Sequence, residues 1–122
     1  MIVLLVALGG ALGALARHGL MLLAASLVPP SFPYGTFAVN VIGCFVFGLS
    51  VGLAEARGGM PPDVRAFLLV GVLGGFTTFS TYAHDSFLLI RNGAGLPALL
   101  NAAGQIVVGL VALWGGWTWM RA

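Results

Sequence analysis

The sequence predicts an all-α integral membrane protein with four transmembrane helices per subunit, the third of them broken in mid-span. The first observation is composition: 60% of the residues are hydrophobic, only 7% are charged, and the mean hydropathy is +1.08, whereas soluble domains are about 25% charged. The second is that four apolar stretches approach or exceed the ~20 residues needed to cross a bilayer. The spans are predicted at residues 2–28, 36–54, 64–90 and 96–120 of a single domain covering residues 1–122.

Short turn-forming segments separate the predicted spans. Residues 29–35 contain three prolines, residues 55–63 are charged and contain two more prolines, and residues 91–95 are rich in glycine, all of which favour turns. The first stretch lacks the basic start and the small-residue cleavage site of a signal peptide, so we expect a retained membrane helix.

Charge and cysteine content exclude several classes of function. The net charge is +2, from five arginines and no lysine, which does not indicate nucleic-acid binding. The single cysteine, Cys44, cannot form an intrachain disulfide or a cysteine metal cluster, and we interpret it as a small buried hydrophobe. His84, Asp85 and Ser86 are adjacent late in the third span but match no nucleophile or metal motif. The sequence therefore predicts that the protein is not an enzyme.

The arginines predict an unusual topology. With four spans, Arg57, Arg65 and Arg121 share one side of the membrane and Arg91 lies on the other. The positive-inside rule fixes one orientation only when the two sides differ more in their number of arginines and lysines than they do here. The sequence therefore predicts a chain that inserts in both orientations.

The third span contains the most informative stretch. Gly74 and Gly75 are poor helix formers that cost about 1 kcal/mol each relative to alanine, and they precede four hydroxyl residues and two aromatic residues, Phe79 and Tyr82. The hydroxyl residues are Thr77, Thr78, Ser80 and Thr81. Hydroxyls compete with the helix for backbone hydrogen bonds, and broken backbone survives in a membrane only where protein or water covers it. We interpret the stretch as a functional site at a Gly-Gly break; the simpler alternative is a kinked helix.

Polar residues in the other spans have two interpretations each. Arg17 is either a snorkelling residue whose head reaches the interface or a fixed positive charge in an aqueous vestibule. Asn40, with Thr36 one turn earlier on the same face, is either an interhelical hydrogen-bond partner or a donor lining a pore. Asn101 and Gln105 are spaced i, i+4 and form one polar stripe. This stripe either forms hydrogen bonds between helices or provides a polar track.

Small residues recur at helical spacing. The small-xxx-small pairs are Gly9/Gly13, Gly48/Gly52 and Gly71/Gly75. Such pairs let helix backbones approach closely in lipid. They predict tight packing and an oligomer. The clustered Trp114, Trp117 and Trp119 indicate an interfacial belt.

Three motifs make the sequence resemble one family. They are GGALGALAR at residues 9–17, GTFAVNVIG at residues 35–43 and GGFTTFSTY at residues 74–82. Their order and spacing, the chain length and the four spans resemble the Fluc (CrcB) family of small fluoride-selective channels over the whole chain.

The resemblance implies passive fluoride export through an antiparallel homodimer with two pores, in the cell (inner or plasma) membrane. It implies a structural sodium ion (Na+) at the dimer interface, held by the backbone carbonyls of Gly74 and Thr77 from each subunit. It also implies an anion pathway lined by polar and aromatic residues of spans two to four, with Arg17 at a vestibule. The pathway residues are Thr36, Asn40, Phe79, Ser80, Thr81, Tyr82, Asn101 and Gln105.

The chain departs from the family pattern at two positions. Tyr82 stands where a phenylalanine is usual, and His18 stands where an aromatic such as tyrosine is common. The change at position 82 bears on the arrangement of the two rings in the pathway.

Two other classes of function provide alternatives. A small proton-coupled multidrug exporter is also a four-span dimer, but it needs a membrane-embedded carboxylate. The first span here has none, and Asp85 lies towards the end of the third span. A non-transporting assembly subunit would explain the glycines but not the hydroxyl and aromatic cluster.

Overall fold

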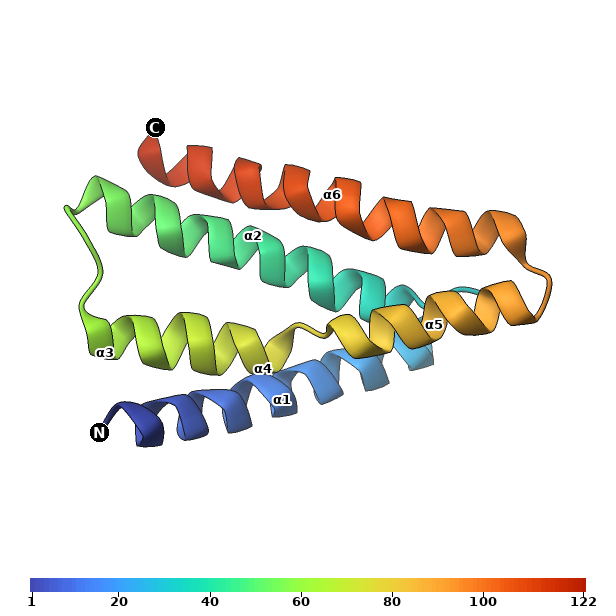
Figure 1. The fold of residues 1–122 in the computed structure, drawn as a ribbon, viewed down its shortest axis with the longest axis horizontal. Coiled ribbons are helices and arrows are strands. Elements are labelled where there is room, and N and C mark those ends of the chain that lie inside the picture. The colour runs from blue at the N-terminus through green and yellow to red at the C-terminus, as the bar shows by residue number, and fades with distance from the viewer.

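Four long helical spans run alongside one another in the computed structural model, which describes residues 1–122 (Figure 1). The third span, Pro62–Arg91, is divided into several segments. In chain order the elements are α1 (Ile2–Leu27), α2 (Tyr34–Ala56), α3 (Pro62–Arg65), the π-helix η1 (Ala66–Leu73), α4 (Gly74–Phe76), α5 (Phe79–Arg91) and α6 (Gly95–Arg121). Each of the four spans is long and apolar enough to cross a membrane. The prediction of four spans with a broken third helix is confirmed.

The two ends of the helical bundle carry different loops. Both termini and the connection between α2 and α3 lie at one end, and the α1–α2 and α5–α6 connections lie at the other (Figure 1). Arg57, Arg65 and Arg121 therefore lie towards the end that holds the termini, and Arg91 lies towards the other end, as the arginine argument assumed.

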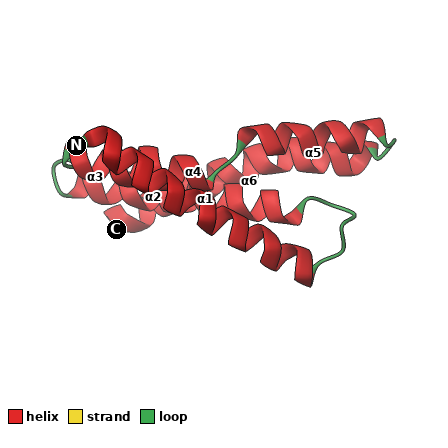
Figure 2. Ribbon diagram, turned by 90° about the horizontal axis from the view of Figure 1, so that it is seen from below, coloured by secondary structure: helices red, strands yellow, loops and turns green.

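The helices pack as two pairs, and the third span changes its packing partner halfway along its length. α2 packs along α6, while α1 packs against η1 and α4. Beyond α4 the third span leaves α1, and α5 packs against α6 instead (Figure 2). The change of partner coincides with the break in the third span.

The interior is built from glycine and polar side chains rather than from large apolar ones. Only 17 of 122 residues are buried, and eight of these are glycines. The buried apolar residues are Val39, Ala66, Leu73 and Ala98, and the buried polar residues are Thr36, Ser50, Thr78, Asn101 and Gln105. Large apolar side chains cover the outside, which is the arrangement expected of a surface that faces lipid.

Close backbone contacts explain the glycines. A Cβ at Gly13 would overlap the carbonyl oxygen of Val72, and one at Gly75 would lie 2.5 Å from the carbonyl oxygen of Gly10. Likewise a Cβ at Gly48 would overlap the backbone of α6. The prediction of tight packing is confirmed. However, these glycines are used between helices of one chain, so they no longer support an oligomer.

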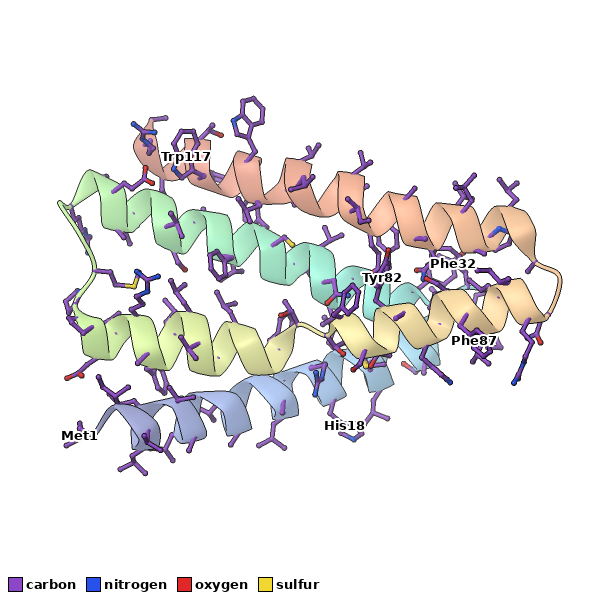
Figure 3. The ribbon with its side chains drawn as sticks, in the orientation of Figure 1. Met1, His18, Phe32, Tyr82, Phe87 and Trp117 are labelled. Carbon is purple, nitrogen blue, oxygen red and sulfur yellow. The ribbon has the colours of Figure 1, made fainter.

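One polar cluster joins α2 to α6 at the end that holds the termini. The Trp117 indole Nε1 donates to Glu55 Oε2 at 2.9 Å, and the Arg121 guanidinium lies 4.3 Å from the Trp117 ring centroid. Trp117 therefore has a partner within the chain (Figure 3). Trp114 and Trp119 are exposed, as an interfacial belt requires.

Candidate functional site

The break in the third span lies at Thr77 and Thr78, not at the two glycines. Thr77 (φ −79°, ψ 158°) and Thr78 (φ −150°, ψ 116°) are extended, whereas Gly74 and Gly75 are helical. The expectation of a Gly-Gly break was therefore wrong by three residues. The physical reason is that Gly75 lacks a side chain in order to pack against Gly10, not in order to leave the helix.

The two threonines end one helix and begin the next. The Thr77 hydroxyl donates to the carbonyl of Leu73 at 2.9 Å. The Thr78 hydroxyl accepts from the Thr81 amide at 3.3 Å and so caps α5, the role for which threonine and serine are favoured at helix N-termini. The hydroxyl cluster thus supplies the local bonds that a broken helix requires.

Asn40 of α2 bonds the exposed backbone at the break. Its Oδ1 accepts from the Thr78 amide at 2.8 Å, and its Nδ2 donates to the Thr78 carbonyl at 3.0 Å. In a continuous helix the Thr78 amide would donate to Gly74 instead. Since Nδ2 also donates to Gln105 Oε1 at 2.7 Å, both amide hydrogens of Asn40 are used within the chain.

The stripe on α6 continues this bonding. Gln105 Nε2 donates to Asn101 Oδ1 at 2.7 Å, and Asn101 Nδ2 donates to the Ser86 hydroxyl at 2.9 Å. Asn101 has no exposed surface, and Gln105 is buried. Of the two interpretations of this stripe, the structure supports hydrogen bonding between helices.

The two aromatic rings at the start of α5 lie side by side. The ring centroids of Phe79 and Tyr82 are 5.5 Å apart, and the planes are inclined at 46°. The Tyr82 hydroxyl donates to the Ala102 carbonyl of α6 at 2.8 Å, and its ring is directed towards α2 and α6 (Figure 3). Phe79 has no comparable cover and is 79% exposed.

Arg17 reaches the break from α1. Its Nη1 donates to the Thr77 carbonyl at 3.3 Å, so the guanidinium lies beside the broken backbone in mid-span and does not snorkel to the interface. A fixed positive charge therefore adjoins the extended segment.

A cavity of about 390 Å³ lies against the break. Asn40, Thr77, Phe79, Tyr82 and Gln105 all border it. Four of the predicted pathway residues thus meet at one cavity, together with Thr77.

A second cavity of about 500 Å³ lies towards the end that holds the α1–α2 loop. Thr36 and Asp85 border it, and the Thr36 hydroxyl donates to Asp85 Oδ2 at 2.8 Å. Thr36 therefore lies at a different cavity from Asn40.

The remaining predicted residues border neither cavity. Ser80 is exposed beside the break, and the Thr81 hydroxyl accepts from Thr78 at 3.1 Å. Asn101 lies behind Gln105, and Gly74 is exposed on the outer face of the third span.

Two residues that organise the site, Thr78 and Ser86, were not among the pathway residues expected from the sequence, although Thr78 was part of the stretch interpreted as a site. Thr78 makes both backbone bonds to Asn40, and Ser86 ends the chain of amides. Ser86 lies i+4 from Tyr82, so this spacing placed it on the same face of α5. No sequence signal indicated its partner on α6.

Comparison with known proteins shows the family. A family model described as CrcB-like protein, Camphor Resistance (CrcB), matches residues 4–117. The chain belongs to the CrcB/FluC family. The resemblance stated from the three motifs is confirmed.

Several relatives carry the name fluoride-specific ion channel FluC, among them the following three. The protein of Nitratidesulfovibrio vulgaris (strain Miyazaki F) is 48% identical over 93% of this chain and 92% of its own length. That of Methylobacillus flagellatus is 47% identical over 93% and 90%. That of Rhodopseudomonas palustris is 41% identical over 98% and 96%. CrcB/FluC relatives that match this chain over nearly their full length are thus named as channels. This agrees with the prediction that the chain is not an enzyme.

Proposed function

We propose that this chain is the subunit of a fluoride-selective channel that conducts the anion passively across the cell membrane. The observation that carries the proposal is the family membership over almost the whole chain, with relatives of 41–48% identity named as fluoride channels. The broken third span with its ring pair and cavity gives that membership a physical basis. The exporter alternative is not supported, because Asp85 is bonded to Thr36 and lies outside the central cavity.

Fluoride is small and strongly hydrated, so a pore must replace its water with donors or positive field. The edges of aromatic rings carry partial positive charge, and Phe79 and Tyr82 border the central cavity. The hydroxyl of Thr81 accepts from Thr78 and so keeps its own hydrogen free to donate. Arg17 adds positive potential at the break.

Within one chain the amides are the less suitable anion ligands. Both hydrogens of the Asn40 amide are donated to protein oxygens, and Asn101 is fully buried. We therefore assign the anion contacts at the central cavity to the two rings, and assign the amides to the support of these rings. Ser80 and Thr81 border neither cavity, and their hydroxyls remain candidate donors beside the break. Thr36, at the second cavity, belongs to the entrance.

The test is anion efflux from liposomes that contain the purified protein. We expect fluoride efflux with no comparable chloride efflux, measured with ion-selective electrodes against protein-free liposomes. Equal rates for the two anions, or no fluoride efflux from folded protein, would contradict the proposal.

We further infer that two copies associate as an antiparallel homodimer. Phe79 is one of two rings at the site and yet is 79% exposed, and Val70 and Gly74 are exposed on the same span. One chain therefore leaves one side of its site uncovered, which a second copy would close. Reporter fusions at the C-terminus should be found on both sides of the membrane; a single location would exclude the antiparallel arrangement.

The sodium ion belongs to this dimer proposal. The Thr78 amide bonds to Asn40 and so leaves the Gly74 carbonyl without its helical donor, and backbone carbonyls suit a hard cation. The Thr77 carbonyl has one lone pair occupied by Arg17, whose charge opposes a cation there. The two carbonyls therefore fit sodium only in combination with the same pair from a second copy. When bound, the ion would supply a fixed positive charge that holds the two breaks together.

A further inference from the structure

Four side chains around α5 form a hydrogen-bond chain with a single direction, which we call the amide relay: Asn40, Gln105, Asn101 and Ser86. Asn40 donates to Gln105, Gln105 donates to Asn101, and Asn101 donates to Ser86. The Ser86 hydroxyl then donates to the Tyr82 carbonyl at 2.9 Å. Hydrogen bonds aligned in this way polarise and strengthen one another.

Both ends of the amide relay lie at the start of α5, one at its N-cap Thr78 and the other in its first turn. It begins where the Thr78 amide donates to Asn40, and it ends at the Tyr82 carbonyl. Between these points it passes through α2 and α6. It therefore fixes α5 to both neighbours over the one turn that carries Phe79 and Tyr82.

Tyr82 is held from two directions as a result. Its carbonyl accepts from Ser86, and its hydroxyl donates to Ala102, the neighbour of Asn101 on α6. The Ser86–Tyr82 bond lies within α5, but Ser86 is itself bonded to Asn101, so a shift of α5 along α6 would strain the Asn101–Ser86 and Tyr82–Ala102 bonds together. The position of the ring thus depends on the register between these two helices.

We propose that Ser86 and Asn101 are positioning residues for conduction, which set the place of the Phe79–Tyr82 ring pair through the amide relay without touching the anion. This rests on the proposed channel function. Neither Ser86 nor Asn101 borders the central cavity, so neither is placed to contact an ion there. A binding constellation must be held to about 0.5 Å by such supporting bonds, which makes the flux sensitive to them.

The test compares Ser86→Ala with two matched variants. Ser86→Thr keeps the hydroxyl. Ser50→Ala removes a serine that makes the same local bond, to the carbonyl of Val46 at 2.8 Å, but that accepts from no amide. If the alanine variant at position 86 fails to fold, Ser86→Cys replaces it, because a thiol is only a weak acceptor.

Two readouts are taken on the full chain in lipid. The first is fluoride efflux per folded protein. The second is the ¹⁹F resonance of 3-fluorotyrosine in chloride buffer. The chain has only two tyrosines, and Tyr34, at the start of α2, serves as the internal reference.

We expect Ser86→Ala to lower efflux several-fold and to move the Tyr82 resonance, while the Tyr34 resonance stays in place. Ser86→Thr and Ser50→Ala should match the parent in both readouts. An unchanged Tyr82 resonance in Ser86→Ala, or a moved resonance with parent efflux, would overturn the positioning role. Absence of fluoride efflux from the parent protein would instead refute the channel function, and the Tyr82 resonance would still decide whether the relay holds the ring.

Discussion

The two halves of the third span are held in different ways. The first half, η1 and α4, lies against α1 with so little space that a Cβ at Gly13 or Gly75 would meet backbone. The second half, α5, is attached to α2 and α6 mainly through side-chain hydrogen bonds, made by Asn40, Asn101 and Tyr82. Where two backbones are in direct contact, no side chain can change rotamer to relieve a clash, whereas polar side chains can. The difference places the part of the span that is held by side-chain bonds beside the cavity, and the rigid part, held by backbone contact, beside α1.

The largest expected effect is on the rigid half. Gly13→Ala should lower the free energy of unfolding by about 3 kcal/mol, because the new methyl overlaps the Val72 carbonyl and overpacking at backbone cannot relax easily. Gly10→Ala is the matched control, since a Cβ at Gly10 meets nothing within 4 Å. Unfolding in detergent, followed by circular dichroism, measures both. Equal stability of the two variants would contradict steric packing as the cause.

The next effect removes the bond between α2 and α5. Asn40→Asp keeps an acceptor for the Thr78 amide but loses both donors, and it places a negative charge against two acceptor oxygens. We expect a loss of about 2 kcal/mol, faster hydrogen exchange in α5 than in η1, and no fluoride efflux. Parent-like exchange in α5 would show that the break does not depend on this amide.

A third change separates conduction from stability. Phe79 is mostly exposed in the single chain, so Phe79→Ile should change its folding stability by less than about 1 kcal/mol while most of the fluoride efflux is lost, because an aliphatic side chain has no positive ring edge. Phe87→Ile is the control, since Phe87 is an exposed ring of α5 that points away from α2 and α6 (Figure 3). Equal efflux from the two variants would contradict a special role for the ring at position 79.

The smallest effect is expected at the phenol of Tyr82. Tyr82→Phe removes the bond to Ala102 but keeps the ring, so we expect a loss of about 1 kcal/mol with efflux largely retained. Tyr82→Ile, which also removes the ring edge, should reduce efflux. Thermal unfolding and liposome efflux on the same preparations distinguish the two contributions, and equal efflux from both variants would exclude the ring edge.

The sequence by itself determined the class of protein and the content of the site. Low charge and four apolar stretches required membrane helices, because no soluble fold accommodates them, and the three motifs identified the family. The cluster of glycine, hydroxyl and aromatic residues located the break to within three residues. These features are local or compositional, so they can be recognised without knowing which helices are neighbours.

Only the tertiary structure decided which groups each polar residue bonds to. The sequence left open whether Asn40, Asn101 and Gln105 line a pore or form bonds between helices. The structure gives each of them a hydrogen-bond partner on another helix, and Asn40 and Gln105 also border the central cavity. The glycine pairs suggested an oligomer until the contacts of α1 with η1 and α4 accounted for two of them, and those of α2 with α6 for the third. A partner distant in the sequence leaves no periodic signal, and a close backbone contact looks the same in sequence whether it forms within a chain or between chains.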